Sequence, residues 1–196
     1  MSLIAASVGL LTALTLAGAT DGYAQVEGGA GAASPAAAFV LSSLDFADGG
    51  TMHRRQVNEQ CGGENISPAL HWRNPPAGTK SFALLMHDPD APGAEGFWHW
   101  IVYDIPATAT SLPAGAGNVR RRLMPTGVIQ GRSSFGTMGY GGPCPPPGKP
   151  HSYYFRLYAL PDATLNVPPD ATATIIAAYA DASALGRAQL VVRYGH

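Results

Sequence analysis

The stretch SYYFRLYAL, residues 152–160, gives the clearest secondary-structure signal in the chain. Successive side chains of a β-strand point to opposite faces, so every second residue lies on the same face. This alternation predicts a long β-strand and favours a fold built around strands. One face would hold Tyr153, Phe155, Leu157 and Ala159, and the other Tyr154, Arg156, Tyr158 and Leu160.

Two further stretches predict strands in the interior of a sheet. Residues 81–87, SFALLMH, are almost continuously apolar, and residues 99–105, HWIVYDI, are rich in β-branched and aromatic side chains. Pro89 ends the first of them, because proline has no N–H for a ladder of hydrogen bonds. Shorter strands are expected at residues 39–41, 69–72 and 189–194.

One helix is expected late in the chain. Residues 171–185 are rich in Ala and place Ile175 and Ile176 at near-helical spacing with later apolar residues, and Gly186 is suited to cap the helix. Several short strands with one late helix predict a mainly-β domain, a sandwich or a barrel rather than a βαβ fold. The segments rich in Gly, Pro or polar residues are expected to be loops: 45–64, 106–127 and 135–150.

The composition of the chain excludes several classes of protein. Of the 196 residues, 46% are hydrophobic and 13% are charged. The hydrophobic fraction provides enough apolar surface for a core and rules out wholesale disorder. The net charge of −1 provides no overall field for nucleic acid or an anionic membrane surface. The 2 cysteines rule out a disulfide scaffold and a four-cysteine zinc site.

The first residues are predicted to be a targeting segment rather than part of the domain. Residues 2–19 carry no charged side chain and end in small residues, which favours a signal peptide at 1–24 over a retained membrane anchor. Residues 25–38 are rich in Gly and Ala and are expected to be a flexible linker. The folded domain is therefore predicted at 39–196, periplasmic or secreted, with no transmembrane segment in the mature chain.

Polar side chains are expected to converge at one rim of the strands. Asp88 follows the 81–87 strand, His99 opens the 99–105 strand and His151 directly precedes the 152–160 strand. If these strands are neighbours, two imidazoles and a carboxylate meet where binding sites usually lie. The Gly-rich loop 139–143 could add backbone N–H groups that cradle an anion.

Two other chemistries are conceivable in this part of the chain, a zinc site and a serine hydrolase. Asp88, His99 and His151 could ligate zinc, but the chain has no HxH or HExxH spacing on one element, so no metal and no other cofactor is predicted. Ser133 or Ser134 could serve a Ser/His/Asp hydrolase, but neither lies in a GxSxG elbow. Taken singly, each signal also fits a structural histidine or an ordinary turn.

In combination, these motifs resemble the phosphatidylethanolamine-binding protein family, and more closely its bacterial YbhB/YbcL (Raf-kinase-inhibitor-like) branch. The similarity runs from about Phe39 to Tyr194. The motifs that carry it, in chain order, are CGGENISP at 61–68, PAGTKS at 76–81, DPDAPG at 88–93, WHW at 98–100, GYGGP at 139–143 and HSY at 151–153.

The resemblance implies two packed antiparallel β-sheets with a small C-terminal helix. It also implies a small cavity that binds phosphate-like groups or phospholipid head groups, and a binding or inhibitory module rather than an enzyme. Ser152 departs from the animal members, which commonly carry arginine there. The implied site residues are Asp88, Pro92, His99, Tyr140, Gly142, Pro143, His151 and Tyr153.

These observations support three functional hypotheses. The first is an exported module that binds a small anion such as phosphate or phosphoethanolamine and modulates a protein partner. The second is a phosphoester or ester hydrolase that uses Asp88, His99 and His151. The third is an inhibitor directed at a protein, with the loops at 106–127 and 135–150 as its contact surface.

The two cysteines, Cys61 and Cys144, lie in separate loops beside motifs assigned to the site. An exported protein meets an oxidising compartment, which favours a disulfide between them over two free buried thiols. Such a bond would hold the 139–150 loop in place and pre-organise the cavity.

Overall fold

The computed structural model describes residues 37–196. The signal peptide predicted at 1–24, and all but the last two residues of the linker predicted at 25–38, lie outside the described residues. None of the described helices is long and apolar enough to cross a membrane.

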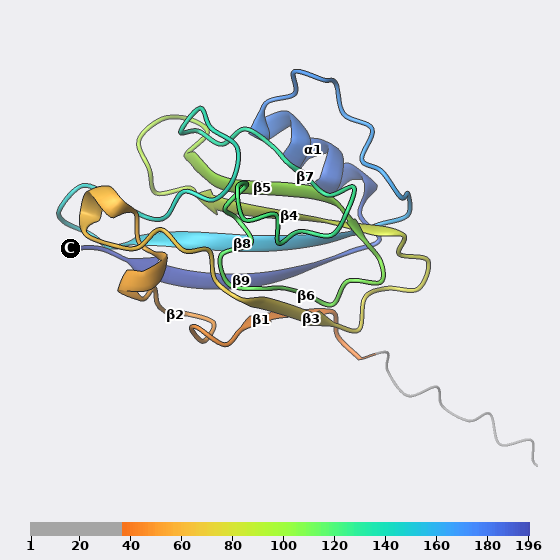
Figure 1. Cartoon of the computed structure of the whole chain (residues 1–196), viewed down its shortest axis with the longest axis horizontal. Helices are drawn as coiled ribbons and strands as arrows, with labels where there is room; N and C mark the ends of the chain where they lie inside the picture. The colour runs from red at the N-terminus through yellow and green to blue at the C-terminus, as the bar shows by residue number, and fades with distance from the viewer. Residues whose placement is uncertain (1–36) are drawn as a thin grey trace, which may run out of the picture. The chain divides into compact units, whose positions relative to one another are not determined.

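Two β-sheets form the framework of the domain (Figure 1). The large sheet has the order β2-β9-β8-β4-β5-β7, and the small sheet has the order β1-β3-β6. The large-sheet strands are β2 (Gly50–Thr51), β4 (Ser81–Asp88), β5 (Phe97–Pro106), β7 (Ile129–Gln130), β8 (His151–Leu160) and β9 (Gly186–Tyr194). The small-sheet strands and the helices are β1 (Val40–Ser43), β3 (Leu70–Arg73), β6 (Ser111–Leu112), the 3-10 turns η1 (Arg54–Gln56) and η2 (Glu59–Cys61), and α1 (Ala173–Ser183).

Both faces of the large sheet are covered, and each has its own apolar core. On one face, Phe82, Leu84 and Met86 of β4 pack with residues of the small sheet such as Leu70 and Trp72. On the other face, residues including Ala83, Leu85 and Ile101 pack with Ile176 and Ala180 of α1. The small sheet and α1 accordingly lie on opposite sides of the molecule (Figure 1).

This double coverage explains the strand patterns seen in the sequence. β4 is apolar at nearly every position because neither face meets water, as expected of an interior strand. In β8, Tyr153, Phe155 and Leu157 face the first core, whereas Tyr158 and Leu160 face the second. The predicted alternation and the mainly-β sandwich with one late helix are confirmed.

Three details differ from the expectation. The sheet is mixed, because β2 pairs with β9 in parallel. The two-residue strands β2 and β6 lie in segments predicted to be loops, where pairing with a distant strand outweighs a weak local signal. Gly186 does not cap α1: the helix ends at Ser183, Ala184 is already extended, and Gly186 is the first residue of β9.

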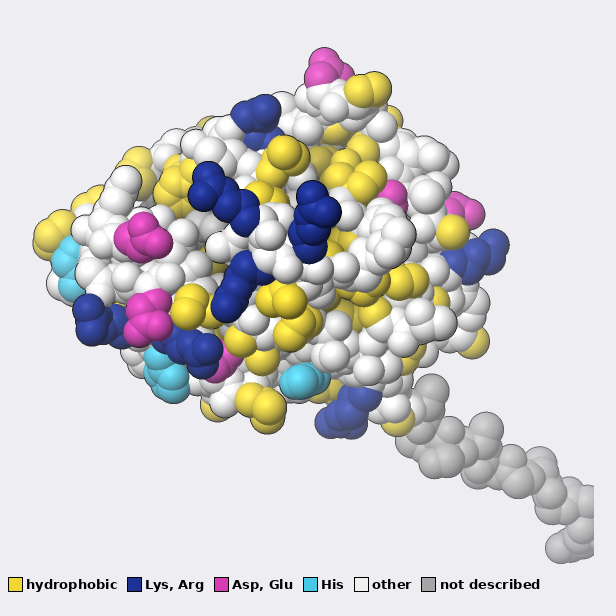
Figure 2. Space-filling view, viewed as in Figure 1, with side chains coloured by type: hydrophobic (Ala, Val, Ile, Leu, Met, Phe, Trp, Pro, Cys, Tyr) yellow, Lys and Arg dark blue, Asp and Glu magenta, His cyan; other side chains and the backbone are white. Residues whose placement is uncertain are grey.

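Charge is unevenly distributed along the described chain. Residues 105–161 contain no Asp or Glu, yet they hold six of the 12 basic residues: Arg120, Arg121, Arg122, Arg132, Lys149 and Arg156. One face of the molecule shows Lys and Arg side chains gathered around its centre, with hydrophobic side chains between them (Figure 2). A net charge of −1 therefore conceals a locally basic surface.

Candidate anion-binding site

Antiparallel pairing brings the three predicted polar residues to one end of the large sheet. β4 pairs antiparallel with both β5 and β8, so the end of β4 lies beside the start of each neighbour. Asp88 is the last residue of β4, His99 is the third residue of β5 and His151 is the first of β8. The sequence-based convergence of these side chains is thus present in the structure.

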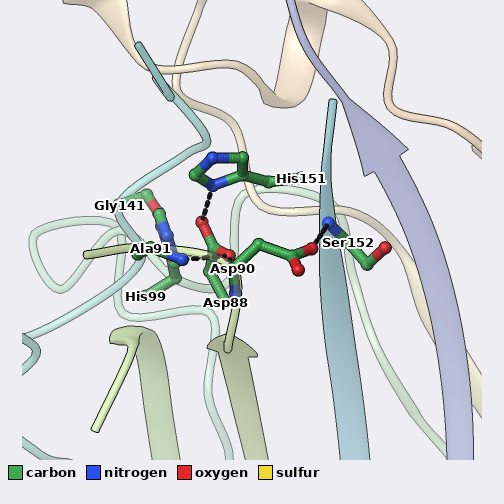
Figure 3. Close-up of polar contacts among 7 residues, drawn as sticks. All are labelled: Asp88, Asp90, Ala91, His99, Gly141, His151 and Ser152. Atoms are coloured by element: carbon green, nitrogen blue, oxygen red, sulfur yellow. Dashed lines mark hydrogen bonds and ion pairs between the residues drawn. The ribbon is translucent and has the colours of Figure 1, made fainter. Parts of the chain in front are cut away.

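Asp88 holds the ring of His151 in a fixed orientation (Figure 3). The Nδ1 of His151 lies 2.8 Å from Oδ2 of Asp88. The other carboxylate oxygen, Oδ1, accepts the backbone N–H groups of Asp90 and Ala91 at 2.9 and 3.1 Å. Both oxygens of Asp88 are therefore bonded within the protein, and within residues 37–196 no protein group bonds to Nε2 of His151.

The ring of His99 is fixed by a different partner. Its Nδ1 lies 2.7 Å from the backbone oxygen of Gly141, and a carbonyl oxygen only accepts, so Nδ1 carries the proton. In return, the N–H of Gly141 donates to the backbone oxygen of His99 at 3.0 Å. Burial lowers the pKa of His99 to about 4, so the ring is neutral at pH 7 and its Nε2 is an acceptor.

Tyr153 adds a phenol that packs against His99 and lines the same cavity as His151. Its aromatic ring meets that of His99 edge to face, with 5.2 Å between the centroids. The hydroxyl is buried and lies within reach of the Asp88 carboxylate, although within the described residues it makes no hydrogen bond of full geometry. Burial, followed by the negative charge of Asp88, raises the pKa of Tyr153, so the hydroxyl keeps its proton and is a donor.

These groups surround a cavity of about 230 Å³. One wall is aromatic: Phe97 and Phe135 meet edge to face, with 4.7 Å between their centroids, and Phe135 lies 5.5 Å from the ring of His99. The cavity is lined by Gln60, Asp88, Ala91, Pro92, Phe97, His99, Phe135, Cys144, Pro145, Pro146, His151 and Tyr153.

Comparison with known proteins identifies the family. The family model for phosphatidylethanolamine-binding protein matches residues 42–195. The chain belongs to the phosphatidylethanolamine-binding protein family.

Bacterial relatives show how close the similarity is. The UPF0098 protein YbcL of Escherichia coli (strain K12) is 41% identical over 162 residues, which cover 81% of this chain and 88% of YbcL. The UPF0098 protein YbhB of the same organism is 43% identical over 138 residues, covering 69% of this chain and 87% of YbhB. The YbhB/YbcL resemblance inferred from the motifs is therefore confirmed.

Solved structures support the same assignment. The crystal structure of E. coli YbcL, described as a new member of the mammalian PEBP family, superimposes with a TM-score of 0.78 at 39% identity. That match covers 82% of this chain and 99% of YbcL. A PEBP homolog from Chlamydia trachomatis, CT736, matches with a TM-score of 0.68 at 30% identity, covering 81% of this chain and 98% of CT736.

Three residues that the family resemblance assigned to the site lie outside the cavity lining: Tyr140, Gly142 and Pro143. The hydroxyl of Tyr140 donates to the backbone oxygen of Gln56 at 2.8 Å. The N–H of Gly142 donates to Oδ1 of Asn65 at 2.7 Å, and a Cβ at Gly142 would lie 2.2 Å from the same Gln56 oxygen. These residues thus hold the 139–143 loop against the 56–65 segment.

The expectation of a backbone anion cradle in this loop is wrong. The N–H groups of Tyr140, Gly141 and Gly142 donate to Gly117, His99 and Asn65, so they are already used. The role of Asn65 could not be predicted from local sequence patterns, because it depends on a partner 77 residues away.

The aromatic wall was also missed from sequence. Phe97 had a usable signal, since it lies two residues before His99 and strand alternation puts both on one face. Phe135 had none, because it lies in an irregular loop.

A disulfide bond holds the part of the cavity lining that comes from the 139–150 loop. Cys61 and Cys144 are bonded, with their Cα atoms 5.5 Å apart. Cys144 lines the cavity together with Pro145 and Pro146, which follow it directly. The bond therefore ties the 139–150 loop to the end of η2, as expected for the pair.

Ser133 and Ser134, the candidate nucleophiles of a hydrolase, already make hydrogen bonds within the protein. Oγ of Ser133 donates to the backbone oxygen of Thr137 at 3.0 Å, and Oγ of Ser134 accepts the N–H of Trp98. Neither serine lines the cavity. Among residues 37–196 there is no group of three or more His, Cys, Asp or Glu side chains arranged to hold a metal ion.

Proposed function

We propose that this protein is a binding module for a small phosphate-like anion, such as phosphate or the phosphoethanolamine head group. The observation that carries the proposal is the orientation of His151. Asp88 holds its Nδ1, within residues 37–196 no protein group bonds to its Nε2, and Tyr153 lines the same cavity. A phenol and the Nε2–H of an imidazolium ring are suitable donors to phosphate oxygens.

The size of the cavity supports a small ligand. A volume of about 230 Å³ lies below the usual range of about 300–1,000 Å³ for drug-sized ligands. A head group or an inorganic anion fits such a space. The acyl chains of a whole lipid would have to remain outside it.

A binding role is proposed in preference to hydrolysis. Asp88 has both oxygens engaged, so it orients His151 instead of acting on a substrate. The lining contains no Ser or Thr hydroxyl, and Cys144 is held in the disulfide. Phosphoester and ester substrates are accordingly expected to show no turnover in a generic panel.

We further propose that the protein works outside the cytoplasm. The leader at 1–24 predicts export, and a disulfide persists in an oxidising compartment. A protein partner that the bound state modulates remains part of this proposal, with the loops at 106–127 and 135–150 as the surface to probe.

The test is isothermal titration of inorganic phosphate and phosphoethanolamine at pH 6 into wild type and His151→Ala. Removing a charge-assisted donor should weaken binding about 10- to 100-fold. His53→Ala is the matched control, because His53 is exposed and lies outside the cavity lining. Equal affinities in wild type and His151→Ala would overturn the proposal.

A further inference from the structure

Three consecutive arginines lie at the surface in the long loop between β6 and β7. Arg120, Arg121 and Arg122 are all exposed, and the side chains that flank them, Val119 and Leu123, are 46% and 41% exposed. A trypsin-like endopeptidase binds a basic side chain in a pocket that holds a carboxylate, and it cleaves the peptide bond that follows. The loop therefore displays the side-chain chemistry that such an enzyme recognises.

The backbone of this loop is also available to a protease. The N–H of Arg121 donates to the backbone oxygen of Asn118 at 3.0 Å, but within residues 37–196 no backbone N–H of residues 122–127 donates to a protein group. Arg122 has a φ of 50°, a left-handed conformation that a residue with a Cβ rarely adopts, so extending the chain there removes strain. Local opening is thus enough to present the bond after Arg122 as the extended segment that a protease cleft binds.

The other arginines are held in structure that resists cleavage. The first 53 residues of the chain contain no Lys or Arg. Arg132 forms a β-bridge with Met138, and the residue after it, Ser133, is buried. The remaining arginines lie in strands or in η1: Arg54, Arg55, Arg73, Arg156, Arg187 and Arg193.

The chain's two lysines are protected as well. The N–H of Lys80 donates to the backbone oxygen of Leu160 at 2.8 Å, and its own backbone oxygen accepts the N–H of Ala107 at 3.2 Å. Lys149 is exposed in an irregular loop, but it precedes Pro150. A bond whose nitrogen lies in a proline ring is a poor substrate for these enzymes.

We propose that the exposed loop is a processing site, at which a trypsin-like endopeptidase cleaves the chain between Arg122 and Leu123. In this hydrolysis the C–N bond breaks, the hydroxyl of a water molecule joins the carbonyl carbon of Arg122, and the hydrogen joins the nitrogen of Leu123. Residue 122 becomes a new C-terminus and residue 123 a new N-terminus. This inference does not depend on the proposed anion binding.

The fold holds the two fragments together after the cut. Cys61 and Cys144 lie on opposite sides of the cleaved bond, so the disulfide joins the fragments covalently. The fragments also interleave in the large sheet, because β8 and β7 of the second fragment pair with β4 and β5 of the first. No residue of the loop lines the cavity. The product is therefore a folded two-chain protein with its cavity intact.

The test is limited proteolysis of the folded protein with trypsin, read by mass spectrometry. The first cut should create an N-terminus at Leu123, and the fragments should run as one band on a non-reducing gel and as two bands after reduction. A lysine-specific endopeptidase should leave the chain intact over the same time, because Lys80 and Lys149 are protected. A first cut at any other bond would overturn the proposal.

A variant shows that the arginine run carries the cleavage. Arg120→Gln/Arg121→Gln/Arg122→Gln should slow the first cut at least about 100-fold, because every other site needs a larger opening of the structure. Lys149→Gln removes a basic side chain from another exposed loop and is the matched control, so it should be cut at the wild-type rate. Cleavage of the triple variant at the wild-type rate would refute the assignment.

Reduction tests the two-chain form. The cleaved and oxidised protein should unfold in urea at a midpoint that does not depend on protein concentration, since the disulfide keeps the fragments in one molecule. After reduction the midpoint should rise with protein concentration, because two separate chains must then associate. Fragments that separate on a sizing column before reduction would overturn the two-chain form.

Discussion

The two histidines of the cavity show how neighbouring atoms decide the chemistry of a side chain. His151 faces the carboxylate of Asp88, which fixes the orientation of its ring through Nδ1. His99 faces a backbone carbonyl in a buried position, which favours the neutral ring. The same residue type is thus held by a carboxylate on one side of the cavity and by a backbone carbonyl on the other.

The buried ring of His99 should make stability depend on pH. The unfolded chain takes up a proton on His99 near pH 6.5, whereas the folded protein takes it up only near pH 4. The free energy of unfolding should therefore fall as the pH drops from about 6.5 to 4, by about 3 kcal/mol from this residue. Below pH 4 both states are protonated, and this contribution stops changing.

Urea denaturation at pH 7, 5.5 and 4 measures the effect. His99→Gln removes the titrating ring, so its stability should fall less steeply over the same range, whatever its stability at pH 7. Parallel pH profiles in wild type and His99→Gln would contradict the assignment of a neutral, buried His99.

Single residues were predictable where they stood at the end of a strong strand. Asp88, His99 and His151 each flank or open a strand with a clear pattern, so their meeting followed from strand pairing. Gly142 stands in an irregular loop, where the partner of its N–H is decided by tertiary contacts. Sequence patterns carry no such information.

At the scale of elements, α1 packs against the large sheet through one face. Its buried residues are Ala173, Ile176 and Ala180. Ile176 is 2% exposed and packs on β4, β5 and β8, whereas its neighbour Ile175 is 40% exposed. Ile176→Ala should lower the free energy of unfolding by about 2–5 kcal/mol, because it leaves a void beneath the helix. Ile175→Ala is the matched control and should change it by no more than about 0.5 kcal/mol. Equal losses in chemical denaturation would contradict this packing.

Elements were predictable in proportion to their length. β4, β5, β8 and β9 have eight or more residues, and each contains a strand that the sequence predicted. β2, β6 and β7 have two residues each, so their own sequence cannot show a period. Their conformation is set by the strand beside them.

At the scale of the whole molecule, one covalent bond links the two segments that enclose the site. Cys61 and Cys144 are 83 positions apart, and a loop of that length should contribute about 4 kcal/mol through the lost entropy of the unfolded chain. Reduction should lower the free energy of unfolding by about this amount and weaken phosphate binding, since the 139–150 loop is released.

Denaturation and titration with and without reductant check this expectation. The Cys61→Ser/Cys144→Ser double variant provides the control, because it should match the reduced wild type and be insensitive to the reductant. A wild type whose stability and affinity are unchanged on reduction would show that the bond does not support the site.

The net charge of the whole chain predicted less about the molecule than local sequence patterns did. A net charge of −1 excluded a strong overall field, but it could not reveal that residues 105–161 carry six basic and no acidic side chains. The fold class, by contrast, could be predicted from the patterns of the strands and the late helix. Those patterns reflect burial in the two apolar cores, which extend through the whole domain.

The place of β9 in the large sheet fixes the order in which that sheet is completed. β9 lies between β2 and β8, yet it is the last strand of the described chain while β2 is the second. During synthesis, Gly50 and Thr51 therefore have no strand to pair with until residues 186–194 have been made. Such distant pairing makes folding slow and leaves sheet edges open during synthesis. A chain cut short before residue 186 would expose the edges of β2 and β8 together.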